Sequence, residues 1–114
     1  MALVVVALIL FAVAAVLGAT MVSRRLGDKP IPLSLAAAHG AFAGLGLVVL
    51  LVAVGQGIGG LGAAALILFV LAALGGFYLF SIYLRKAPLP VSSIVVHGTI
   101  AVIGFVVLLI ALVK

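Results

Sequence analysis

The stretch PIPLSLAAAHG, residues 30–40, decides the fold, because the chain repeats it as PLPVSSIVVHG at residues 88–98. Each copy opens with Pro-x-Pro, continues with serine and aliphatic residues, and ends with a His-Gly pair inside a long apolar run. His39 and His97 are the only two histidines of the chain. The pattern therefore predicts two equivalent membrane helices, each carrying one histidine at the same depth.

The composition of the whole chain indicates an integral membrane protein. Of its 114 residues, 69% are hydrophobic and 6% are charged, which leaves too few polar residues to cover a soluble domain. Four apolar runs reach the ~20 residues that are needed to cross the hydrocarbon layer of a bilayer. We expect spans at Ala2–Val22, Leu33–Val54, Leu61–Leu84 and Val91–Val113.

The two halves of the chain align without a gap when one half is shifted by 58 positions. Proline, serine, histidine and glycine residues match across the halves, which exceeds the background similarity of two leucine-rich and valine-rich sequences. The alignment predicts an all-α, integral membrane four-helix bundle built from a duplicated two-helix hairpin, with a pseudo-two-fold axis along the membrane normal. Residues 1–114 would form a single membrane domain, with repeats at 1–56 and 59–114.

The basic residues predict the orientation of the chain. Two polar turns hold five of the six cations: Arg24, Arg25, Lys29, Arg85 and Lys86. The connection at 55–60 carries no charge. By the positive-inside rule, both basic turns lie in the cytoplasm and both termini outside, which for a bacterial protein means the inner membrane. The prolines of each turn suit the first turn of the following helix, and Ser34 is an expected cap.

The composition also excludes several kinds of chemistry. There are no cysteines, so thiol catalysis, iron–sulfur clusters and thiolate metal sites are ruled out. Asp28 is the only acidic side chain, which excludes paired-carboxylate catalysis and the intramembrane acidic residue of small multidrug exporters. The net charge of +5 suits orientation and lipid contact rather than nucleic acid, because the cations form no long run.

The two histidines are the strongest candidates for a functional site, because an imidazole about 10 Å inside the membrane edge needs a bonding partner. Four and seven residues further along the same helical face, both copies carry small residues: Ala43 and Gly46 in one helix, Ala101 and Gly104 in the other. Gly40 and Gly98 follow the histidines directly. These positions would leave a trough that admits either a neighbouring helix or a flat ligand.

Two neutral imidazoles on separate helices can serve as the axial ligands of one b-type haem. Under this hypothesis His39 and His97 bind the metal, the six small residues face the porphyrin, and the five basic residues pair with its propionates. The chain then resembles membrane b-type cytochromes, which are helix bundles with histidines on separate spans and glycines against the porphyrin. It is also similar to small bacterial membrane proteins with Pro-x-Pro and His-Gly at the cytoplasmic ends of their helices. The resemblance implies an electron carrier or a small subunit of a larger oxidoreductase, working beside a quinone, rather than a catalyst on its own.

Two alternatives use the same residues. A chlorophyll or bacteriochlorophyll would also accept histidine as a ligand to its magnesium. Otherwise the protein binds no cofactor and is a structural or assembly subunit, whose histidines bond to a hydroxyl or carbonyl group on a neighbouring helix. In each case the expected partners are the lipid bilayer and either other membrane subunits or further copies of this chain, with no nucleic acid.

Overall fold

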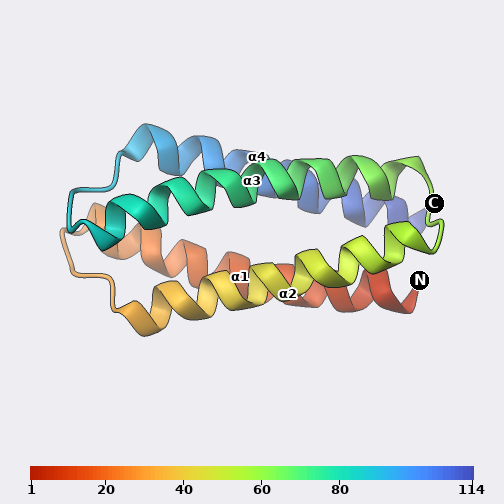
Figure 1. Ribbon diagram of the computed structural model, residues 1–114, viewed down its shortest axis with the longest axis horizontal. Helices are drawn as coiled ribbons and strands as arrows, with labels where there is room; N and C mark the ends of the chain where they lie inside the picture. The colour runs from red at the N-terminus through yellow and green to blue at the C-terminus, as the bar shows by residue number, and fades with distance from the viewer.

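The computed structural model describes all 114 residues, as four α-helices joined by short turns. The helices are α1 (Ala2–Leu26), α2 (Leu33–Gly55), α3 (Gly60–Leu84) and α4 (Val91–Val113). Figure 1 shows the antiparallel hairpins α1–α2 and α3–α4 lying side by side, with both basic turns at one end and both termini at the other. The prediction of an all-helical, four-helix fold is confirmed.

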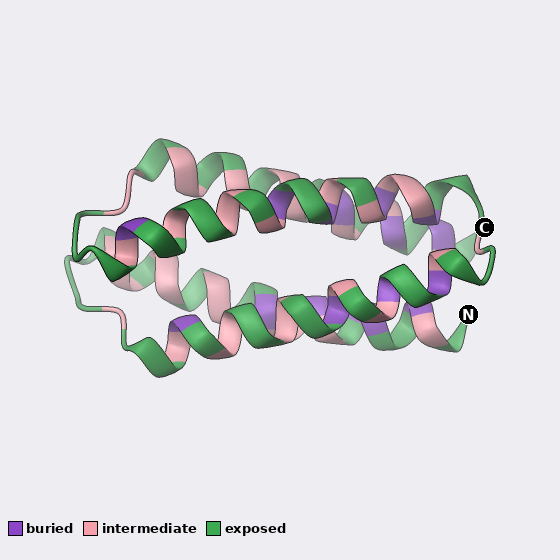
Figure 2. Cartoon of the chain, in the orientation of Figure 1, coloured by how far each residue is buried: buried purple, intermediate pink, exposed green.

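The surface of the bundle is apolar. All four helices are long and apolar enough to cross a membrane, and 17 of the 114 residues are buried. Exposed segments, many of them with large aliphatic side chains, therefore cover most of the outside of the bundle, as Figure 2 shows. Lipid tails solvate such a surface well, whereas water does not. The fold supports an integral membrane protein that is in contact with the bilayer.

At the basic turns, the predicted end of α1 is wrong, whereas the predicted ends of the other three helices are confirmed. α1 continues past Val22 because residues 23–26 remain helical. Arginine is a good helix former and is favourable in a last turn. α2 and α4 begin at Leu33 and Val91, as predicted, and Pro32 and Pro90 occupy their N-cap positions with extended backbone rather than the first helical turn. Ser34 makes no cap hydrogen bond.

The core lies in the half of the bundle near the termini (Figure 2). Ten buried residues from all four helices form one cluster there: Val4, Ala7, Leu8, Phe11, Leu50, Ala53, Ala65, Phe69, Leu108 and Ala111. Within it the rings of Phe11 and Phe69 stack in parallel, with their centroids 3.8 Å apart. One ring comes from each hairpin, so this stack joins the two hairpins at this end. The half near the basic turns has no comparable cluster of buried apolar side chains.

Positions that are 58 residues apart have the same local geometry. The bounds of α3 and α4 are those of α1 and α2 shifted by 58. Asp28 and Lys86, at the same offset, have φ angles of 55° and 58°, in the left-handed region that often follows a helix end. The two turns therefore deliver α2 and α4, and with them the two histidines, in equivalent ways.

Candidate functional site

The imidazole rings of His39 and His97 meet between the two hairpins. Their centroids lie 6.2 Å apart, and their planes make an angle of 75°. α2 and α4, which carry them, stand diagonally opposite in the bundle, because α1 and α3 each pack against both of these helices and α2 and α4 do not pack against each other. The two histidine side chains therefore approach each other across the bundle, although the backbones of α2 and α4 are not in contact.

A hydrogen bond within its own hairpin fixes each ring. His39 Nδ1 lies 2.8 Å from the carbonyl oxygen of Ala14 on α1, and His97 Nδ1 lies 2.7 Å from that of Ala72 on α3. Because a carbonyl oxygen can only accept, Nδ1 carries the proton and donates it in both rings. When the ring is neutral, Nε2 keeps a free lone pair, and neither Nε2 makes a hydrogen bond to the protein. The pair thus offers two lone pairs to a ligand.

Two glycines that the sequence hypothesis did not include make room for these rings. A Cβ atom added to Gly18 would lie 3.0 Å from His39 Cε1, and one added to Gly76 would lie 3.2 Å from His97 Cε1. Both distances are shorter than ordinary carbon–carbon contacts, so a side chain at either position would press on an imidazole. Each glycine precedes its histidine by 21 residues, and this shared spacing is the signal that could have revealed them.

The small residues predicted to face a flat ligand have different surroundings. Gly46 and Gly104 are buried. A Cβ atom at Gly46 would lie 2.9 Å from the ring of Phe11, and one at Gly104 would lie 3.3 Å from that of Phe69. Phenylalanine rings of the same hairpin therefore occupy the trough at these two glycines.

The remaining small residues lie closer to the histidines along the helices. A Cβ atom at Gly40 or Gly98 would meet no atom within 4 Å, so both positions are open. Ala43 and Ala101, one turn beyond the histidines, are half-buried. Along α2 and α4, the alanines thus lie between the histidines and the buried glycines Gly46 and Gly104.

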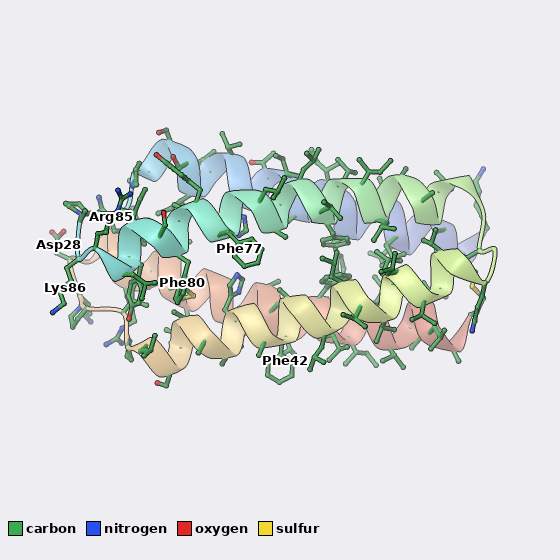
Figure 3. The ribbon with its side chains drawn as sticks, viewed as in Figure 1. Asp28, Phe42, Phe77, Phe80, Arg85 and Lys86 are labelled. Atoms are coloured by element: carbon green, nitrogen blue, oxygen red, sulfur yellow. The ribbon has the colours of Figure 1, made fainter.

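The five basic residues lie at the end of the bundle formed by the two turns, where Figure 3 labels Arg85 and Lys86 beside Asp28. Three arginines donate their Nε–H groups to backbone carbonyls: Arg24 to Pro30, Arg25 to Leu89 and Arg85 to Ser81. The outer nitrogens of these guanidinium groups make no further hydrogen bond to the protein. They remain available to an anionic group such as a carboxylate.

A groove of about 310 Å³ opens beside His97 on the α3–α4 hairpin. Three of its lining residues carry hydroxyl groups: Tyr78, Ser92 and Ser93. The other lining residues are Leu71, Gly75, Val96, His97 and Ile100. The first hairpin has the larger Leu17 and Phe42 where the second has Gly75 and Ile100, and Figure 3 shows Phe42 projecting outward from α2. The groove thus lies on the hairpin that has the smaller residues at these two positions.

The two imidazoles alone could hold only a metal that arrives with most of its ligands. The chain has no group of three or more His, Cys, Asp or Glu side chains, whereas metal ions held by protein alone usually take four or more ligands. A metal macrocycle brings its own equatorial donors and needs only axial ones. Metal–imidazole bonds are about 2 Å long, so two imidazoles on opposite sides of one metal have their ring centroids roughly 6 Å apart. The centroids of His39 and His97 lie 6.2 Å apart in an edge-on arrangement.

Comparisons with known proteins add no relative to this picture. No protein-family model, curated protein or solved structure matches the chain. Its function is therefore inferred from its own residues and their geometry.

Proposed function

We propose that this chain is a membrane electron-transfer protein that binds one b-type haem through His39 and His97. The imidazole pair carries the proposal: the ring centroids lie 6.2 Å apart, and each Nδ1 is held by a carbonyl. A hydrogen bond from the second ring nitrogen is the usual support of a metal-binding histidine, because it fixes the tautomer and the ring direction. Bound haem would supply one-electron chemistry, through iron that cycles between its ferric and ferrous states.

The residues of the chain have separate tasks in this function. The two histidines supply the axial lone pairs, and the carbonyls of Ala14 and Ala72 orient them. The basic turns offer cations to the propionates, and the apolar helices keep water away from the site. No acid, base or nucleophile accompanies the histidines, so substrate chemistry belongs to a partner, either a larger oxidoreductase or a quinone dissolved in the lipid. The hydroxyl groups of the groove beside His97 could bond to a quinone carbonyl.

The two alternative interpretations account for less of the geometry. A magnesium chlorin with one axial histidine gives a role to one ring of the pair and leaves the other unexplained. A purely structural role accounts for the Nδ1 bonds within each hairpin. It assigns no role to the two Nε2 atoms, neither of which bonds to the protein.

The absorption spectrum of the protein tests the proposal directly. We expect protein purified in mild detergent, from cells that make both haem and chlorophyll-type pigments, to show a Soret band that shifts on addition of dithionite, with sharp visible bands. A short-chain quinone added to the reduced protein should restore the oxidised spectrum. A far-red band would instead identify a chlorin. A colourless protein would overturn both cofactor proposals and favour the structural role.

We also propose that the chain is a duplicated hairpin in a bacterial inner membrane, with a pseudo-two-fold axis along the membrane normal and cytoplasmic basic turns. The shared 58-residue offset of the helix bounds and of the histidine bonds supports the duplication. The chain has no cysteine, so introduced cysteines can report orientation. Lys29→Cys and Lys86→Cys should react with an impermeant maleimide from the cytoplasmic side, and Gln56→Cys from the opposite side. Reaction of all three positions from one side would contradict this topology.

A further inference from the structure

Two hydrogen bonds join the hairpins at the end formed by the basic turns. Arg25, in the last turn of α1, donates its Nε–H to the carbonyl oxygen of Leu89 at 2.9 Å. Tyr83, near the end of α3, donates its hydroxyl to the carbonyl oxygen of Ile31 at 2.7 Å. The two donors are 58 residues apart, and so are the two acceptors. Each hairpin thus donates one bond and accepts one, and we call these two bonds the clasp.

The Pro-x-Pro motif provides the acceptors of the clasp. Ile31 and Leu89 each lie between two prolines. Proline has no N–H group, and it keeps the preceding residue extended. The carbonyls of both residues accordingly lie outside the helices and accept no backbone hydrogen bond. The motif therefore presents a free carbonyl in a restricted stretch of backbone just before each histidine-bearing helix.

The clasp connects the helices that hold the two imidazoles. α1 carries the carbonyl and the glycine that contact His39. Arg25 lies seven residues beyond that glycine, or about 10 Å along the helix. It bonds to Leu89, which is two positions before the start of α4. α3 repeats the arrangement for the other histidine, with Tyr83 reaching the residue two positions before the start of α2. Each donor helix thus contacts one histidine and anchors the helix that carries the other.

Few side chains are buried at this end of the bundle, namely Ala36 on α2 and Ile82 on α3. The buried cluster around Phe11 and Phe69 lies toward the termini. Near the turns, an open groove of about 550 Å³ is lined by residues of both hairpins: Pro30, Ile31, Leu33, Tyr83, Leu84, Lys86 and Ala87. Because so few side chains are buried near the turns, we expect the spacing of the hairpins here to depend on the clasp.

We propose that Arg25 and Tyr83 are positioning residues, whose clasp holds the hairpins at the spacing at which the two imidazoles pair. The functional role of this spacing, which is to let both histidines bind one haem, rests on the proposed function. The distance between the hairpins can be measured in protein without haem. Loss of both donors lets the hairpins separate near the turns. The separation in turn lowers the fraction of haem that both histidines can bind.

Pulsed electron paramagnetic resonance measures the spacing directly. Spin labels on Ala37→Cys and Val95→Cys, two exposed positions on α2 and α4, report the distance between the hairpins in cofactor-free protein in lipid nanodiscs. The double variant Arg25→Met/Tyr83→Phe should shift this distance to longer values and broaden its distribution. In haem-loaded protein the same double variant should lose part of its low-spin absorption.

Matched controls separate the clasp from charge and general stability. Arg24→Met removes the same charge and Tyr78→Phe the same hydroxyl group, but neither residue bonds to the other hairpin, so both should keep the original distance distribution in cofactor-free protein. Compared with Tyr83→Phe, Tyr83→Arg should restore the spin-label distance and the low-spin absorption. At the equivalent position of the first hairpin, Arg25 already makes this kind of bond with an arginine side chain.

The outcomes distinguish this proposal from the haem proposal. An unchanged distance distribution in the double variant would overturn the clasp, whatever the spectrum. A lengthened distance, together with no haem in any variant, would support the clasp as the spacer of the hairpins and overturn the haem site. If the double variant does not fold, Tyr83→Phe alone, which removes one oxygen atom, should show a smaller shift in the same direction, and no shift would count against the clasp.

Discussion

Replacement of either His39 or His97 by alanine should abolish the low-spin haem spectrum, and the two variants should lose it equally. A metal bound between the two imidazoles needs both of them, because each hairpin supplies only one ring. The ring centroids lie 6.2 Å apart, and each Nδ1 is bonded within its own hairpin, which leaves Nε2 for the metal. Two independent sites would behave differently, since each single variant would keep the signal of the other site. The measurement is the absorption spectrum of each purified variant, normalised to protein and compared with that of the double variant.

The stability of these variants separates metal binding from unfolding. Each substitution removes one hydrogen bond between helices, and such bonds contribute on average only about 0.6 kcal/mol in membranes, and about 1.7 kcal/mol at most. The cofactor-free variants should therefore unfold at nearly the temperature of the original protein. Free imidazole added to either variant should restore part of the low-spin spectrum by taking the place of the missing ring. An unchanged spectrum in either variant would exclude the bis-histidine site.

The positions of the helices could be predicted from the sequence because the membrane imposes a simple rule on them. A run of apolar residues has to be helical to satisfy its backbone in lipid, so hydropathy located all four helices to within a few residues. The end of α1 was missed because the predicted span ended where polar residues begin. The helix ends instead where its backbone hydrogen bonds end, beyond Arg25.

The histidine site was less predictable, because it depends on which side chain fills which space. The sequence indicated that Gly46 and Gly104 leave room on one helical face, but it could not identify Phe11 and Phe69 as the groups that fill it. It also gave no sign that Arg25 reaches a carbonyl on the other hairpin. Such contacts depend on the rotation and spacing of the helices, which composition and periodicity leave open.

The substitution Gly76→Leu should also destroy the site, although Gly76 is not a ligand. Its added Cβ atom would lie 3.2 Å from His97 Cε1 and 3.7 Å from Nδ1, and the rest of the leucine side chain would need the space of the ring. His97 would have to turn away and give up its bond to the Ala72 carbonyl. We expect loss of the low-spin spectrum, and a loss of stability of about 1–3 kcal/mol, the usual cost of overpacking.

The adjacent residue provides the control for this prediction. A Cβ atom at Gly75 would lie 3.6 Å from the nearest His97 atoms, an ordinary contact distance, and the groove beside it can accept a larger side chain. The first hairpin already has leucine at the equivalent position, Leu17, beside Gly18. Gly75→Leu should therefore keep the spectrum and the unfolding temperature of the original protein, whereas Gly76→Leu loses both. Equal behaviour of the two variants would mean that the imidazole of His97 does not pack against Gly76. The same change made one residue apart thus tests the position of the ring, because the two variants have the same composition and hydrophobicity.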